Sequence, residues 1–128
     1  MRGIMENKRD DTRVVINRPI LLQEFTYDNE YEKLDSPITA EIVDLSSSGA
    51  LVKTNLDLPI GSCFYLKLAL QNENVPIIFN VIRKDKAEEP SYIYGCDFLN
   101  INESIESKLR KFIFAEQIKI HNMNKKRA

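Results

Sequence analysis

The sequence predicts a mainly β domain, an antiparallel sheet closed into a small barrel, followed by a C-terminal helix. Between residues 13 and 99, apolar side chains alternate with polar ones at a period of two, and short polar turns separate successive segments. After residue 102, apolar side chains instead recur at helical spacing. Because no helical pattern separates the strands, we expect antiparallel pairing and not a parallel sheet with crossover helices.

The first two strands are expected at residues 13–25 and 38–45. Pro19 cannot donate a hydrogen bond to a neighbouring strand, so the first strand should be bulged, or lie at an edge, near that residue. The segment between these strands, residues 26–35, is acidic and polar and is expected to be a hairpin-like loop. The later strands show the clearest alternation. They are expected at residues 50–53, 64–70, 75–83 and 92–98.

The helix is expected to begin after Asn102, a good N-cap residue, and Glu103 and Glu106 complement the positive end of its dipole. Its apolar stripe extends to about Ile120 and should pack on the barrel. The chain therefore divides into three parts. These are a flexible N-terminal arm, the barrel with its helix, and a basic tail, at residues 1–12, 13–121 and 122–128.

Composition is typical of an ordinary cytoplasmic domain. The 128 residues are 43% hydrophobic and 29% charged, and the formal net charge is −1, whereas nucleic-acid-binding proteins usually carry a basic excess. No segment approaches the roughly 20 apolar residues of a membrane span, and the N-terminus lacks the apolar core of a secretory signal. Cys63 and Cys96 lie far apart and lack metal-site spacing, so we expect buried apolar thiols and no metal.

The first short motif is Arg9-x-x-x-Arg13, at the junction of the arm and the first strand. A guanidinium presents five donors in a rigid fork that matches a phosphate or the O6/N7 edge of guanine. Two such groups four residues apart can converge on one ligand. The alternative interpretation is a solvated charge cluster, because Asp10 and Asp11 can neutralise both arginines.

The second motif is Asp44-x-Ser46-x-x-Gly49, at the turn before the third strand. These residue types are common in turns because their side chains bond to nearby backbone and glycine tolerates a positive φ. The same residues also suit a purine ligand. Asp44 can accept the N1–H and N2–H of a guanine, Ser46 can donate to a phosphate, and Gly49 lets a ligand approach the backbone.

Together, the two motifs and the strands around them resemble the PilZ domain family. Further similarity lies in Asn80-Val-Ile-Arg83 and in Tyr94-Gly-Cys-Asp-Phe98 before the helix, so the resemblance covers roughly residues 8–118. It implies a six-stranded antiparallel barrel that binds the bacterial second messenger cyclic di-GMP. The binding residues that it implies are Lys8, Arg9, Arg13, Asp44, Ser46 and Gly49.

The resemblance implies a receptor that is not an enzyme and needs no cofactor besides its ligand. The ligand would order the N-terminal arm and relay a signal to a protein partner in motility, polysaccharide export or adhesion machinery. Lys8 replaces an arginine that many members carry, which disfavours a stacked pair of ligand molecules. Whether one or two ligand molecules bind stays open. The protein is either a monomer or a homodimer. The alternative is a PilZ-like interaction module that does not bind nucleotide.

Two further classes fit less well. An enzyme would need a catalytic constellation, but the single histidine, His121, lies near the expected helix end, and the sequence contains no P-loop or Ser-His-Asp order. A single-strand nucleic-acid barrel would need a row of stacking aromatics on a basic face. Tyr92, Tyr94 and Phe98 share one face of the last strand, but we expect that face to be core.

Overall fold

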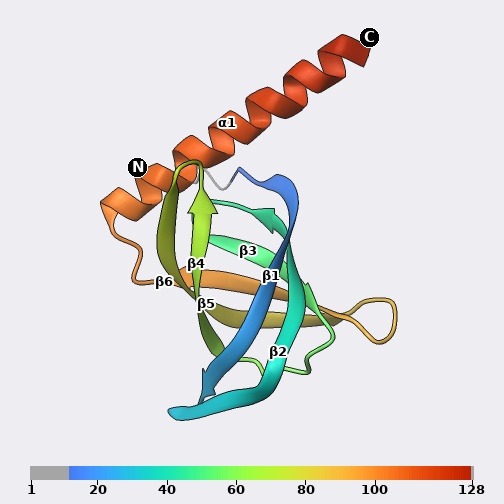
Figure 1. Cartoon of the computed structure of the whole chain (residues 1–128), viewed down its shortest axis with the longest axis vertical. Coiled ribbons are helices and arrows are strands. Elements are labelled where there is room, and N and C mark those ends of the chain that lie inside the picture. Colours follow the sequence, from blue (N-terminus) through green and yellow to red (C-terminus); the bar gives the residue numbers. More distant parts are fainter. Residues whose placement is uncertain (1–11, 128) are drawn as a thin grey trace, which may run out of the picture.

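The computed structural model describes residues 12–127, which form a closed six-stranded barrel with one helix across an end (Figure 1). Every paired strand is antiparallel, and the order around the barrel is β1-β2-β3-β6-β5-β4. The predicted antiparallel barrel with a C-terminal helix is therefore confirmed. The elements are β1 (Val14–Tyr27), β2 (Glu30–Leu45), β3 (Gly49–Thr54), β4 (Cys63–Leu70), β5 (Glu73–Lys86), β6 (Tyr92–Leu99) and α1 (Glu103–Arg127).

Strand β1 is irregular near its proline, as predicted. The register with β2 shifts between Val15 and Arg18, and Asn17 within this bulge has a φ of 45°. Pro19 follows the bulge and pairs with Glu41 of β2. On its other edge, β1 pairs with β4 through a single residue pair among the described residues, Thr26 with Cys63. Pro19 lies outside this pair, so its missing N–H leaves no hydrogen bond to β4 unmade.

The prediction of a loop at residues 26–35 is wrong, because most of this segment is strand. β1 and β2 continue as a two-stranded ribbon, and Asp28 and Asn29 alone form the connecting turn. Both residues have positive φ, of 52° and 64°, as in the tight turns that match the twist of a hairpin. The acidic residues do not prevent a strand here, because both faces of the ribbon are largely exposed.

The helix is also longer than predicted. α1 continues to Arg127 instead of ending near Ile120, so the expected basic tail is helical over its described part. No glycine or proline interrupts this segment, and basic residues at a helix C-terminus interact favourably with its dipole. The predicted N-cap is confirmed, since the Ile105 amide donates to Asn102 Oδ1 at 2.8 Å. No helix among residues 12–127 is long and apolar enough to cross a membrane.

The barrel interior is filled by the alternating apolar positions that the sequence indicates. Phe79 stacks on Phe64 and meets Phe98 edge to face, each pair with ring centroids 5.0 Å apart. Tyr94 is fully buried, and its hydroxyl accepts the Leu58 amide at 2.7 Å. The aromatic face of β6 is therefore core, as predicted, and is not a stacking row for nucleic acid.

Helix α1 covers the end of the barrel at which the second motif lies, and its C-terminal half extends beyond the sheet (Figure 1). Leu109, Phe112 and Ile113 are buried against the core. Arg18 of β1 holds this contact from the barrel side, with its guanidinium 5.2 Å from the centroid of the Phe112 ring. Its Nη1 also donates to the carbonyl of Ala69. The helix is thereby fixed at the start of β1 and the end of β4.

Candidate functional site

The β1–β2 ladder brings the two sequence motifs together. Val14 pairs with Leu45 and Val15 with Asp44, so the residue before β1, Arg13, lies beside Asp44. Arg13 Nη1 donates to Asp44 Oδ1 at 2.8 Å, and the side chains are 43% and 14% exposed. The carboxylate is thus held by a guanidinium that still faces solvent. Both groups remain close enough to contact a single ligand.

Ser46 organises the turn between β2 and β3. Its side chain is fully buried, and its Oγ accepts the amides of Ser48 at 3.2 Å and Gly49 at 3.1 Å. The backbone closes the same turn through a 2.8 Å bond from the Ser46 amide to the Gly49 carbonyl. In this conformation the hydroxyl serves the turn, so donation from Ser46 to a phosphate would require the turn to open and stays a prediction.

Gly49 is required by the barrel itself. Gly49 pairs with Asp97 of β6, and a Cβ added to the glycine would lie 2.3 Å from the Cys96 carbonyl oxygen. No side chain fits at such a distance from a backbone atom. Close approach of β3 to β6 therefore explains this glycine without a ligand, a different reason from the ligand approach that the motif suggests.

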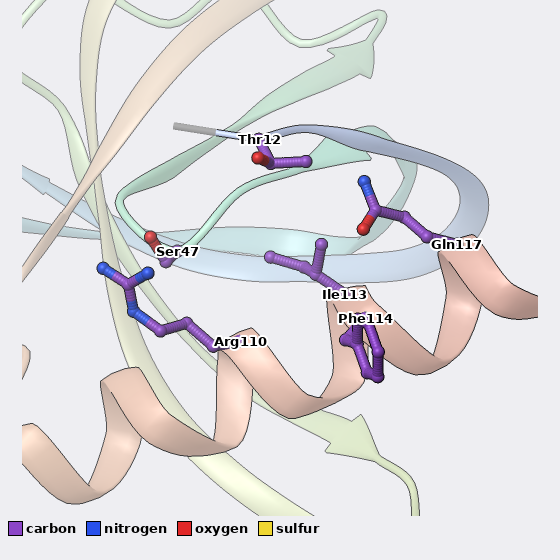
Figure 2. A pocket seen from close by; sticks show the side chains of 6 residues that line it. All are labelled: Thr12, Ser47, Arg110, Ile113, Phe114 and Gln117. Carbon is purple, nitrogen blue, oxygen red and sulfur yellow. The ribbon is translucent and has the colours of Figure 1, made fainter. Parts of the chain in front are cut away.

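A cavity of about 200 Å³ adjoins the turn, between the barrel and α1 (Figure 2). Ser47 and Thr12 border it from the barrel side, and Arg110 extends from α1 toward Ser47 in this view. Ile113 forms part of its apolar wall. The complete lining is Thr12, Ser47, Arg110, Ile113, Phe114 and Gln117.

The structure unites four of the six predicted binding residues, Arg13, Asp44, Ser46 and Gly49, at one end of the barrel. The other two, Lys8 and Arg9, lie outside the described residues. The cavity adds two polar residues that the motifs do not predict, Ser47 and Arg110. The position of Ser47 inside the second motif is a signal for it, whereas Arg110 has none, because its place depends on how α1 docks.

The rest of the described chain offers no alternative chemistry at this end. Among residues 12–127, no group of three or more His, Cys, Asp and Glu side chains is placed to hold a metal ion. His121 is exposed on the part of α1 that lies beyond the cavity residues. The site therefore combines cations, one carboxylate and uncharged polar side chains with an apolar wall, which suits anion and hydrogen-bond recognition.

Solved structures share this fold. The PilZ domain of Escherichia coli YcgR with c-di-GMP is 18% identical with a TM-score of 0.63, over 92% of this chain and 98% of that one. Escherichia coli YcgR in complex with c-di-GMP is 19% identical with a TM-score of 0.66, over 94% of this chain and 50% of that one. The Bacillus subtilis inhibitor of motility MotI/DgrA is 13% identical with a TM-score of 0.61, over 89% of this chain and 53% of that one. The chain thus spans about half the length of the last two proteins.

Sequence comparison identifies the family. No curated protein matches the chain. The profile of the PilZ domain, in contrast, matches residues 7–115. This range includes both arginines of the first motif, the whole second motif, all six strands and the first half of α1. The chain belongs to the PilZ domain family.

Proposed function

We propose that this protein is a cytoplasmic receptor that binds cyclic di-GMP where its N-terminal arm meets the barrel. The observation that carries the proposal is the 2.8 Å contact between Arg13 and Asp44, one residue from each motif, beside the turn at residues 46–49. The complexes of YcgR with c-di-GMP, which share the fold, support the same ligand.

The chemistry of this pair matches the ligand. Arg13 can donate a forked pair of hydrogen bonds to a phosphate or to guanine O6 and N7. Asp44 can accept from guanine N1–H and N2–H, a pair of donors that adenine lacks. Because each side chain already holds the other in place, less conformational entropy is lost on binding. Lys8 and Arg9 of the arm are proposed to contact the same ligand.

Titration calorimetry with cyclic di-GMP tests the proposal, with cyclic di-AMP and GTP as matched controls. Saturable heat for cyclic di-GMP alone is expected, and the same curve gives the number of ligands bound. Equal binding of cyclic di-AMP would refute guanine recognition by Asp44. No heat from a folded sample would refute the receptor function.

The output is proposed to be ordering of the arm, which would change the protein surface at this end of the barrel and be read by a protein partner. The partner would belong to motility, polysaccharide export or adhesion machinery, and the similarity to an inhibitor of motility is consistent with the first of these. Hydrogen exchange of residues 1–13 should slow at saturating ligand. Unchanged exchange would refute this mechanism while leaving ligand binding intact.

A second candidate function, an interaction module without nucleotide, is favoured by one specific observation. Ser46 and Gly49, two residues of the second motif, have structural roles in the turn and against β6 that need no ligand. A folded protein that gives no heat with cyclic di-GMP but is captured by a partner would establish this alternative.

A further inference from the structure

We propose that helix α1 forms one wall of the nucleotide site and that Arg110 is a third cation for the ligand phosphates. The inference rests on the proposed function and extends it to a residue that neither motif contains. It starts from the cavity between α1 and the second-motif turn, in which Arg110 and Ser47 face each other (Figure 2).

The position of Arg110 relative to the motif is set by the turn. Ser47 lies between Ser46, whose hydroxyl holds the turn together, and Ser48, whose carbonyl accepts the Phe98 amide at 2.9 Å. This short loop is therefore fixed to both β3 and β6. Arg13 contacts Asp44 before the turn, and Arg110 borders Ser47 within it. Each guanidinium group is thus linked to this loop, Arg13 through Asp44 before it and Arg110 through the cavity beside Ser47.

Arg110 is carried by a helix that cannot easily move away. The neighbouring residues Leu109 and Phe112 are buried, and Arg18 of β1 lies over the Phe112 ring. The ion pair between Arg110 and Glu106 is loose by contrast, because its atoms are 3.6 Å apart and both side chains are half-exposed. Exposed pairs of this kind contribute little stability, so the contact with Glu106 competes only weakly with a phosphate.

The size of the cavity indicates how the ligand would lie. Pockets that enclose a small molecule usually measure about 300–1,000 Å³, and this one measures about 200 Å³. It would therefore receive part of a cyclic dinucleotide, and the remainder would lie over Asp44 and Arg13. A ligand with two phosphates suits this arrangement, because one phosphate can face Arg13 and the other Arg110.

The test is calorimetric titration of the full chain and its variants with cyclic di-GMP. Arg110→Gln should raise the Kd about 10-fold, the loss expected for one charge-assisted bond. The conservative variant Arg110→Lys keeps the charge without the fork and should fall between this variant and wild type. Lys111→Gln is the matched control, because it removes an equal charge from the next residue of the helix and should leave the Kd within about 2-fold.

A gain-of-affinity variant separates a phosphate contact from a structural role. Glu106→Gln removes the carboxylate that competes for Arg110, so it should tighten binding about 2-fold to 3-fold. In the Arg110→Gln background the same change should have a smaller effect. Equal effects in both backgrounds, or equal Kd values for Arg110→Gln and Lys111→Gln, would overturn the inference.

The outcome also distinguishes this inference from the function on which it rests. If wild type binds and Arg13→Ala weakens binding, while Arg110→Gln matches wild type, the receptor function stands and α1 is not part of the site. If wild type gives no heat, both fail together. Melting temperatures of all variants should lie close to wild type, because Arg110 and Lys111 are exposed.

Discussion

The two ends of the β1–β2 ladder contain similar residues but hold them differently. At the motif end (Arg13 to Val15 with residues 44–49), the polar groups are packed against β3, β6 and α1. At the hairpin end (residues 24–35), the strands project as a ribbon that pairs with β4 through Thr26 and Cys63, and only Phe25 and Leu34 of this ribbon pack against the core. Asp44 and Ser46 at the first end have fixed partners, whereas the charges of the second end are mostly solvated.

This difference determines where a ligand site can form. A polar group fixed by tertiary contacts loses little entropy on binding, whereas an exposed flexible one must be ordered first. The net charges of the two ends favour the motif end as well. The hairpin end has five acidic residues against one lysine and would repel a dianionic ligand, while Arg13 and Arg110 flank the motif end. We therefore expect mutations at the two ends to have separate effects.

The largest expected effect is on stability at the motif end. Gly49→Ala places a methyl group 2.3 Å from a backbone oxygen and should lower the free energy of unfolding by about 3 kcal/mol or more. At the hairpin end, Asn29→Ala should cost only about 1 kcal/mol, the strain of alanine at a φ of 64°. Urea unfolding measures both, and equal losses would contradict the comparison.

The next effect is on affinity. Arg13→Ala should raise the Kd for cyclic di-GMP about 10-fold to 100-fold, because a charge-assisted contact is lost and Asp44 loses its fixed orientation. Arg9→Ala is expected to cost less, since Arg13 is held in place at the strand edge by Asp44. Lys33→Ala of the hairpin end is the charge-matched control, and a Kd change as large as that of Arg13→Ala would show that only general electrostatics is at work.

A smaller effect is expected from a single hydroxyl. Ser46→Ala leaves the amides of Ser48 and Gly49 without their buried acceptor and should lower the free energy of unfolding by about 1–2 kcal/mol. Ser36→Ala, at an exposed position of β2 next to the ribbon, should change it by less than about 0.5 kcal/mol. Should Ser46→Ala leave stability intact but abolish ligand binding, the serine would be a direct ligand contact after all.

The smallest effect concerns the two thiols, which report on the two ends without any mutation. Burial, helped by Asp97, raises the pKa of Cys96 from its ordinary value of 9.0 to about 12. Cys63 at the β1–β4 junction is only half-buried, so a thiol reagent at pH 8 should label Cys63 first. The contribution of Cys96 to stability should be complete below pH 9 and fall as the pH rises toward 12, because the unfolded thiol ionises first.

Much of the fold could be predicted from sequence because its signals are local. Alternation in β4, β5 and β6 reports burial directly, and Pro19 marked the bulge in β1. The ribbon at residues 26–35 could not be predicted in this way, because a strand exposed on both faces lacks alternation and its acidic residues resemble a loop. The end of α1 was missed for a similar reason, since a helix that leaves the barrel has no apolar stripe to follow.

The candidate site could be predicted in position but not in detail. The motifs predicted that Arg13 and Asp44 serve one ligand, and the ladder register does bring the two side chains together, but the pair they form was not predicted. Glycine is required at position 49 because β6 lies too close to β3 there for a Cβ atom. β6 is more than 40 residues further along the chain, so no local pattern in the sequence predicts this contact. Arg110 likewise enters through the docking of α1. These contacts are tertiary, so only a three-dimensional structure shows them.

The measurement that tests the central claim most directly is a titration of isotope-labelled protein with cyclic di-GMP, followed by amide chemical shifts in NMR. We expect shifts at Arg13, at residues 44–49 and along α1 from Arg110 to Gln117, with residues 24–35 unchanged. Shifts centred on the hairpin end, or no shifts at saturating ligand, would contradict it.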